Sequence, residues 1–292
     1  MITGSLIIEQ LLNGLVLGCM YATFASGLTL IFGTMKILNL AHGEFFMIGG
    51  FVLYFAITSF GIPPILGLLL AVGIVFILGV LVEKTIIGPL LDRPGWQDST
   101  IAASIGLGIF FQNFVLKVWG EKFKNLPYFF DGTFEFFGFR LAHQRAFILI
   151  TTTVVMLTFW VFIKKAKVGM GLRATAQDRD AATLVGINAK RIYTITFSMS
   201  CAMASFSAAL LLPIYSVNPW VGHALLMKGI ITCVLGGLGS FEGAILAGIL
   251  LGCAESIAVI IFSSQWMAVV SFVILIAVLA IRPSGLFGTK DW

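Results

Sequence analysis

The polar side chains that could do chemistry in this chain lie within strongly apolar runs or at their edges. Asn39, His42 and Glu44 fall within six residues at the start of one run, and Glu255 stands between the apolar strings LLGCA and SIAVIIF. An ionisable group in hydrocarbon is costly to desolvate, so such residues indicate either a function or a specific partner. For the first three, the alternative is a polar cap at a helix start. We take all four as candidates for a translocation pathway.

Glu255 is the most deeply embedded of these groups and therefore requires a hydrogen-bond donor. The sequence offers Lys228, Gln112 and Asn113, each of which belongs to another apolar run. A structural hydrogen bond and a substrate contact would satisfy a buried carboxylate equally well. Both roles therefore stay open for Glu255.

The sequence carries no set of residues for covalent or metal chemistry. The histidines His42, His143 and His223 lie in three different regions, and no nucleophile stands beside a base. The four cysteines lie in apolar runs without C-x-x-C spacing, which is typical of packing residues. The glycine-rich tracts lack the G-x-x-x-x-G-K-[ST] string of a nucleotide-binding loop, and close helix packing explains them. We expect no catalytic residue, no metal and no cofactor on this chain.

The composition requires an apolar phase beyond a protein core. Hydrophobic residues make up 59% of the 292 residues and charged residues only 11%, whereas soluble proteins carry about 25% charged residues. Runs of roughly 18 or more apolar residues are long enough to cross the hydrocarbon core as helices. We predict an all-α polytopic membrane protein, a single transmembrane domain over residues 1–292 with eight or nine transmembrane segments. The predicted spans are Leu6–Phe32, Phe45–Phe60, Ile65–Leu81, Ile101–Val118, Phe147–Ile163, Ile192–Ile214, Ala224–Leu238, Ala244–Phe262 and Met267–Ile281.

A weak internal repeat accompanies these spans. Residues 39–51 (NLAHGEFFMIGGF) and residues 236–249 (GGLGSFEGAILAGI) both interrupt an apolar run with small residues and a lone Glu. Gly-broken segments in two halves of a chain are typical of transporters with discontinuous, re-entrant helices. Chance similarity between Gly-rich apolar strings is the alternative.

The basic excess of the chain lies in residues 164–191. They hold seven of the 18 Lys and Arg and two of the 13 acids, so their net charge of +5 equals that of the whole chain. The positive-inside rule makes this segment cytoplasmic. Since the basic residues are not interleaved with aromatics, they predict attraction to membrane lipid rather than to nucleic acid.

Alternation of the spans then places residues 117–146 and the amino end outside the cell. This loop carries five Lys and Arg, which opposes the positive-inside rule. Aromatic and polar residues alternate along its second half, which predicts a strand-like or interfacial lid.

Residues 173–187 (RATAQDRDAATLVGI) have the composition of a short helix. Ala174, Ala181, Leu184 and Val185 form one apolar side, and Gly186 is a natural stop. Gly169 and Gly171 would let the backbone turn before it. A solvated cytoplasmic loop and a surface helix that docks in a groove of a partner are both compatible with this pattern.

Over essentially its whole length the chain resembles the permease subunits of bacterial ABC importers for branched-chain amino acids. The motifs that carry the resemblance are NGLVLGCMYA (13–22), ILNLAHGEFFMIGGFV (37–52), SIGLGIFFQN (104–113), GMGLRATAQDRDAATLVGIN (169–188), VLGGLGSFEGAILAGILLGCAE (234–255) and RPSGLFG (282–288).

The resemblance implies that the 169–188 segment rests on an ATPase subunit and that the AHGE string lies by a broken helix on the pathway. The predicted coupling residues are Gly171, Arg173, Ala174, Asp178, Ala182, Leu184 and Gly186. Implied partners are a second, different but related permease, two ATPase subunits and an extracytoplasmic binding protein, with ATP and Mg²⁺ acting through the ATPases. The implied location is the bacterial cytoplasmic membrane, as a multi-pass protein.

The function predicted from residues and resemblance together is an ATP-driven importer subunit for branched-chain or other hydrophobic amino acids, forming half of the pathway. Distant relatives of similar architecture carry urea or short amides, which is the first alternative. The second is a free-standing secondary transporter, in which Glu44, Glu242 and Glu255 would serve a coupling ion. A free-standing carrier needs no docking segment, so residues 164–191 favour the importer.

Overall fold

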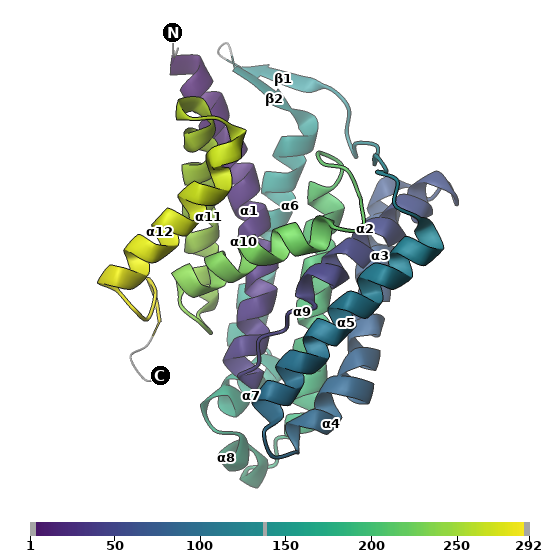
Figure 1. Ribbon diagram of the computed structural model, residues 1–292, viewed down its shortest axis with the longest axis vertical. Coiled ribbons are helices and arrows are strands. Elements are labelled where there is room, and N and C mark those ends of the chain that lie inside the picture. The colour runs from purple at the N-terminus through teal and green to yellow at the C-terminus, as the bar shows by residue number, and fades with distance from the viewer. Residues whose placement is uncertain (1–3, 137–138, 289–292) are drawn as a thin grey trace.

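The computed structural model describes residues 4–136 and 139–288, which form a bundle of long apolar helices with one small β-hairpin (Figure 1). The helices in chain order are α1 (Gly4–Met35), α2 (His42–Thr58), α3 (Pro64–Val82), the π-helical turn η1 (Glu83–Ile87), α4 (Gly88–Leu91), α5 (Trp96–Trp119), α6 (His143–Lys165), α7 (Lys167–Gln177), α8 (Arg179–Leu184), α9 (Ala189–Leu211), α10 (Val221–Gly236), α11 (Phe241–Ile261), the 3₁₀ turn η2 (Ser264–Trp266) and α12 (Met267–Ile281). The antiparallel strands are β1 (Thr133–Phe136) and β2 (Phe139–Ala142).

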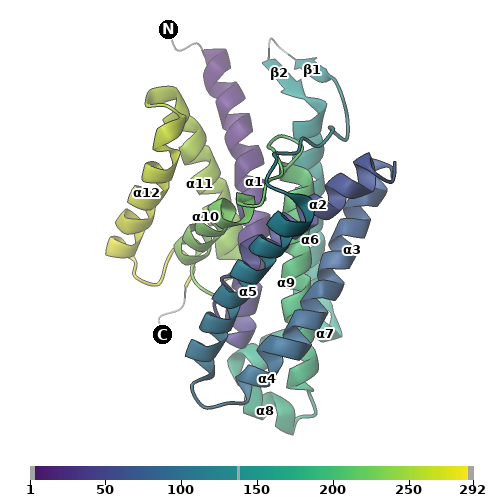
Figure 2. The same ribbon diagram turned by 45° about the vertical axis from the view of Figure 1, so that its right-hand side comes forward.

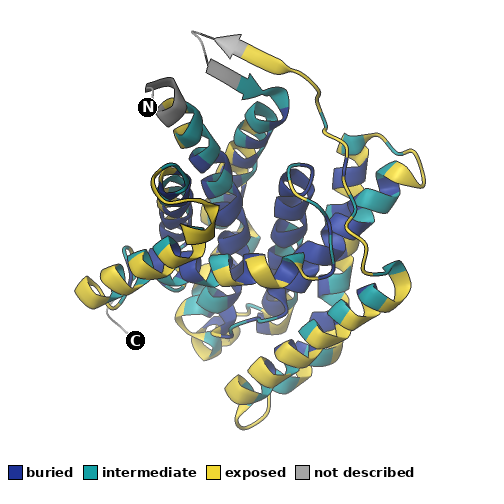
Figure 3. Ribbon diagram, turned by 45° about the horizontal axis from the view of Figure 1, so that its top comes forward, coloured by how far each residue is buried: buried dark blue, intermediate teal, exposed yellow. Residues whose placement is uncertain are grey.

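All nine predicted apolar segments are helices, which confirms the polytopic all-α class. Within the described residues, seven helical segments are long and apolar enough to cross a membrane, while α2 and α10, of 17 and 16 residues, are shorter. The outer faces of α5 and α12 are widely exposed, whereas α1 and α9 are mostly buried (Figure 3). Exposed apolar faces on spanning helices are the surfaces that lipid or another subunit covers.

Glycines bring α1 and α11 into backbone contact, and this is the most extensive helix interface in the chain. A Cβ added at Gly18 would stand 2.7 Å from the Cα of Ile249, and one at Gly252 would stand 2.3 Å from the N of Gly18. Lipid is as apolar as a leucine side chain, so helices in a membrane associate mainly through close packing of this kind. The predicted packing role of the Gly248–Gly252 tract is therefore confirmed.

The amino ends of the two short helices meet inside the bundle. A Cβ added at Gly43 of α2 would stand 2.2 Å from the carbonyl oxygen of Gly222 on α10, and one at Gly222 would stand 2.3 Å from that of Gly43. Figure 1 shows α10 lying across the long helices rather than along them. The predicted break at residues 39–51 is the turn that leads into α2, and α2 begins next to the start of α10.

This contact differs from the predicted correspondence between residues 39–51 and 236–249. Both segments contain a break, but the first leads from a spanning helix into α2, and the second leads from α10 into the spanning helix α11. In space, the start of α2 lies against the start of α10, where Gly43 and Gly222 approach each other.

The predicted loops lie at the expected ends of the molecule. The amino end and the β1–β2 hairpin share one end, and α4, α7 and α8 share the other (Figures 1 and 2). The hairpin confirms the strand-like character of residues 117–146, and a bridge from Lys124 to Val217, with N···O distances of 2.9 and 2.8 Å, ties this loop to the segment before α10. The hairpin of residues 117–146 and the helices of residues 164–191 therefore lie at opposite ends of the molecule, and which end faces the cytoplasm stays a prediction.

We predict that Gly43→Ala destabilises the protein, because the added methyl group must displace the backbone at Gly222. Overpacking of this kind costs about 1–3 kcal/mol, and the thermal midpoint in detergent should fall accordingly. Gly106→Ala on α5 is the matched control, since a Cβ there meets no heavy atom within 4 Å. Equal midpoints for the two variants would contradict the packing assignment.

Candidate functional site

The turn before α2 holds two buried polar groups whose hydrogen bonding is incomplete. Asn39 is 2% exposed, and its Oδ1 accepts a hydrogen bond from the N–H of Ala41 at 3.1 Å. The Asn39 Nδ2 and the Glu44 Oε2 are buried and make no hydrogen bond within the described residues. Buried polar atoms are normally paired, so unpaired ones indicate a place for water or a ligand.

Helix α5 covers this turn. The Leu40 N–H donates to the Ser104 Oγ at 3.2 Å, and Gly108 of the same helix faces the Glu44 side chain. A glycine at this position leaves space above a carboxyl group that is only 7% exposed. Asn39 and Glu44 thus lie at one place in the bundle, between the start of α2 and α5, as candidates for substrate contact.

His42 is the first residue of α2, and its ring contacts two neighbouring helices. It is fully buried, its Nε2 lies 3.3 Å from the carbonyl oxygen of Phe24 on α1, and its Nδ1 lies 3.5 Å from the Ser200 Oγ on α9. The Ser200 hydroxyl donates to the Gly27 carbonyl at 2.7 Å. A neutral imidazole with its hydrogen on Nε2 donates to the Phe24 carbonyl. His42 therefore joins α1, α2 and α9 at the break.

Glu255 lies in a different place, within a closed polar cluster. It is fully buried, and its carboxylate accepts hydrogen bonds from the Tyr21 hydroxyl at 2.8 Å, from the Lys228 ammonium and from the Ser271 hydroxyl. The Lys228 Nζ also lies 2.8 Å from the Ser271 Oγ. Of the predicted donors Lys228 is confirmed, whereas Asn113 on α5 donates to the Ile109 carbonyl. The cluster joins α1, α10, α11 and α12.

The segment predicted as one helix over residues 173–187 is two helices. Asp178 adopts an extended conformation (φ −154°, ψ 114°), and its carboxylate accepts from the N–H groups of Asp180 and Ala181 at 2.8 and 2.9 Å, capping α8. Asp caps favour a new helix start over continuation of the previous helix. The predicted stop is confirmed, because Gly186 has φ +88° and the Ile187 N–H bonds back to Ala182.

The predicted coupling residues differ in accessibility. Gly171 and Ala182 are buried, Ala174 is half-buried, and the Arg173 guanidinium donates to the Ile163 carbonyl. Leu184 is 89% exposed at the tip of α8, next to the exposed Gly186. Among the predicted coupling residues, Leu184 is the large apolar side chain that is most open to another protein.

The glycines predicted to turn the chain before this segment have another role. Gly169 lies within α7, where a Cβ would stand 2.3 Å from the Ile163 carbonyl oxygen, and one at Gly171 would stand 2.8 Å from Ile192. The turn itself falls at Ala166 (φ −72°, ψ 149°). Both glycines allow α7 to pack closely, which a sequence pattern does not distinguish from flexibility.

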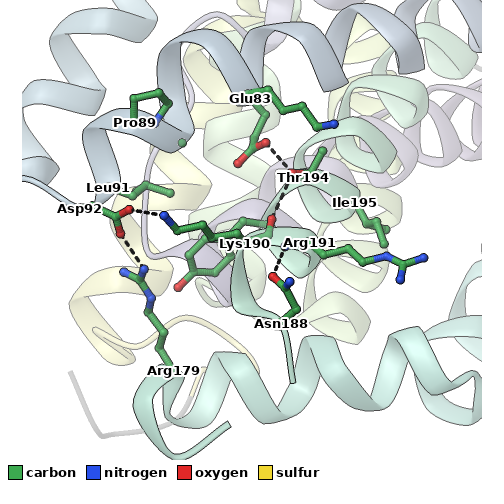
Figure 4. A pocket seen from close by; sticks show the side chains of 13 residues that line it. Glu83, Pro89, Leu91, Asp92, Arg179, Asn188, Lys190, Arg191, Thr194 and Ile195 are labelled. Carbon is green, nitrogen blue, oxygen red and sulfur yellow. Dashed lines mark hydrogen bonds and ion pairs between the residues drawn. The ribbon is translucent and has the colours of Figure 1, made fainter. Parts of the chain in front are cut away.

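A polar cleft of about 730 Å³ opens at the same end, between η1–α4 and α8–α9 (Figure 4). Two sets of contacts join the sides of the cleft. The Thr194 hydroxyl donates to the buried Glu83 carboxylate at 2.6 Å. Asp92 pairs with Arg179 at 2.7 Å and with Lys190 at 2.8 Å. Sequence reasoning missed this cleft, because only folding brings residues 83–92 beside residues 179–194. Within the described residues no group of three or more His, Cys, Asp or Glu is suited to hold a metal ion.

Comparison with known proteins agrees with this architecture. Residues 10–279 match the family described as branched-chain amino acid transport system / permease component. The high-affinity branched-chain amino acid transport system permease protein LivH of Escherichia coli K12 is 35% identical, over 97% of this chain and 96% of its own length. BraD of Pseudomonas aeruginosa is also 35% identical, with the same coverage. A probable LivH of Methanocaldococcus jannaschii is 25% identical over 92% of this chain and 88% of its own.

The match covers the helices that build the bundle, including both short helices and the α7–α8 segment. Seven helices of spanning length make the chain a multi-pass protein of the bacterial cytoplasmic membrane. By its sequence, the chain belongs to the permease components of branched-chain amino acid transport systems.

Proposed function

We propose that this chain forms half of the translocation pathway of an ATP-driven importer and couples it to separate ATPase subunits through α8. The single observation that carries the proposal is the exposed apolar tip of α8. Leu184 is 89% exposed and Val185 is 76% exposed, at the end of the molecule where the basic segment lies. An apolar tip in a polar, charged segment is suited to a hydrophobic groove on a partner. A free-standing carrier has no use for it.

The other subunits of the proposed importer follow from this role. The ATPase subunits supply nucleotide, Mg²⁺ and the hydrolysis step, while a second related permease completes the pathway. A binding protein delivers the substrate at the opposite end, where the β1–β2 hairpin lies. The chain itself changes only its conformation.

The proposed substrates are branched-chain amino acids, in keeping with the names of the relatives. The amino ends of α2 and α10 carry partial positive charge, which favours the carboxylate of a zwitterion. The unpaired Glu44 carboxyl oxygen and Asn39 amide can bind an ammonium and a carboxylate respectively. The apolar residues around them suit a branched aliphatic side chain.

Glu255 is assigned to a different task, the anchoring of α10. Its carboxylate is fully buried and accepts hydrogen bonds from Tyr21, Lys228 and Ser271, so its charge is already compensated within the bundle. Because α10 lies across the bundle, a buried charged pair that ties its middle to α11 and α12 fixes where its amino end sits.

We predict that Leu184→Ser combined with Val185→Ser weakens association with the ATPase subunits at least about tenfold, because burial of two apolar side chains is lost. Co-purification from membranes measures the association. Tyr128→Ser is the matched control, since it removes a 49% exposed aromatic from the loop before β1, at the opposite end. Undiminished co-purification of the double variant would refute docking through α8.

We predict that the complete transporter in proteoliposomes imports radiolabelled leucine only with ATP and a binding protein. Excess isoleucine and valine should compete, whereas urea and acetamide should not, because neither has a carboxylate or an apolar branch. Competition by urea alone would instead assign the short-amide substrate class, and ATP-independent uptake would assign a secondary transporter.

We predict that Lys228→Met destabilises the protein by about 3 kcal/mol or more, because it leaves the Glu255 carboxylate buried without its cation. Adding Glu255→Gln to Lys228→Met should recover most of the loss, as measured by thermal midpoints in detergent. Lys84→Met, at an exposed lysine, controls for loss of charge. If the Glu255→Gln variant keeps its stability but transports poorly, Glu255 has a role in the translocation pathway and not only in anchoring α10.

A further inference from the structure

The Asp92 carboxylate connects both ends of residues 179–190, which contain α8, to the end of α4. Asp92 follows α4, and its Oδ1 lies 2.7 Å from the Arg179 Nη2 while its Oδ2 lies 2.8 Å from the Lys190 Nζ (Figure 4). Arg179 is the first residue of α8, and Lys190 lies in the first turn of α9. The chain between them contains α8 and its exposed tip. Asp92 therefore contacts residues 179–190, which contain α8 and its exposed tip, at both of their ends.

These ion pairs are too exposed to contribute much stability. The side chains of Arg179, Asp92 and Lys190 are 37%, 43% and 77% exposed, and pairs of this kind contribute at most about 1 kcal/mol each. Lys190 and Arg179 lower the pKa of the Asp92 carboxyl below its usual range, so it stays charged at neutral pH. The importance of these pairs is therefore that they connect the end of α4 to α8 and α9.

A second contact across the cleft joins η1 to α9. Glu83, in the π-helical turn η1, is 4% exposed and accepts from the Thr194 hydroxyl of α9 at 2.6 Å. A π-turn within an otherwise α-helical segment is often found at functional sites. With Glu83 at its start and Asp92 at its end, the η1–α4 segment is fastened to α8 and α9 at two points.

The η1–α4 segment leads directly to the candidate pathway. Gly95 (φ +69°) makes the tight turn into α5. Along α5, Ser104 accepts from the Leu40 N–H at 3.2 Å, and Gly108 faces Glu44. A continuous series of contacts thus runs from the docking tip through Asp92 and α5 to the turn before α2. Another series runs through α7, which packs on α1 and α9.

We propose that Asp92 is a positioning residue for transport, which makes the α4–α5 hairpin move with α8 so that ATP-driven displacement reaches the turn before α2 through α5. The proposal rests on the docking of α8 with an ATPase. Asp92 touches neither nucleotide nor substrate in this arrangement. Its effect is on how much transport each hydrolysis event produces.

The test uses the complete transporter in proteoliposomes, with import and ATP hydrolysis measured together. Asp92→Asn keeps the shape of the side chain but removes its charge, and we expect import per ATP hydrolysed to fall roughly threefold to tenfold, as for residues that couple distant sites. Asp92→Glu should retain most of the wild-type ratio. Combining Asp92→Asn with Arg179→Gln should add little further loss, because both changes break the same contact.

Asp98→Asn is the matched control, because Asp98 lies at the same end, in the first turn of α5, and makes no ion pair within the described residues. An unchanged ratio for Asp92→Asn, or an equal loss for Asp98→Asn, would overturn the proposal and favour transmission through α7. Loss of ATPase co-purification in Asp92→Asn would also overturn it, since Asp92 would then support docking. If the wild-type chain itself fails to co-purify with ATPases, the importer function fails instead.

Discussion

The need to satisfy every backbone hydrogen bond away from water governs this structure. In hydrocarbon an unpaired N–H or C=O costs several kcal/mol, so the apolar runs become helices, and any helix that ends within the bundle must be covered by protein. Helix α2 begins in this way, since Ala41 and His42 are fully buried. At the start of α2 the cap residue makes no side-chain hydrogen bond, and the turn is satisfied by Asn39 and by Ser104 of α5. The position of α5 is thus a consequence of the break that it covers.

The same environment explains why glycine appears at the closest contacts. Without a hydrophobic drive between helices, association depends on how closely their backbones approach. Gly18 and Gly252 allow this between α1 and α11, and Gly43 and Gly222 allow it between the two short helices. The charged pair of Lys228 and Glu255 then ties α10 to α11. Packing by small residues and one buried ion pair together determine where the two amino ends meet.

The two ends of the molecule have different chemistry because they have different tasks. One end carries a β-hairpin and the loop before α10, joined through Lys124 and Val217. The other carries the basic segment, the polar cleft and an apolar tip at Leu184. The basic residues at this second end predict the orientation of the chain by the positive-inside rule. They include Arg179 and Lys190, the partners of Asp92, through which we propose that motion is transmitted.

The sequence alone determined the class of the protein, its nine apolar segments, the polar segment 164–191 and the stop at Gly186, because hydropathy, charge and glycine act locally along the chain. It also identified Lys228 as a possible partner of Glu255. It did not determine that Asp178 divides the docking segment, that Gly169 and Gly171 serve packing, or that Glu44 and Glu255 lie in separate environments. Nor did it indicate Asp92. These features depend on which side chains are brought together from distant parts of the chain, and only tertiary packing decides that.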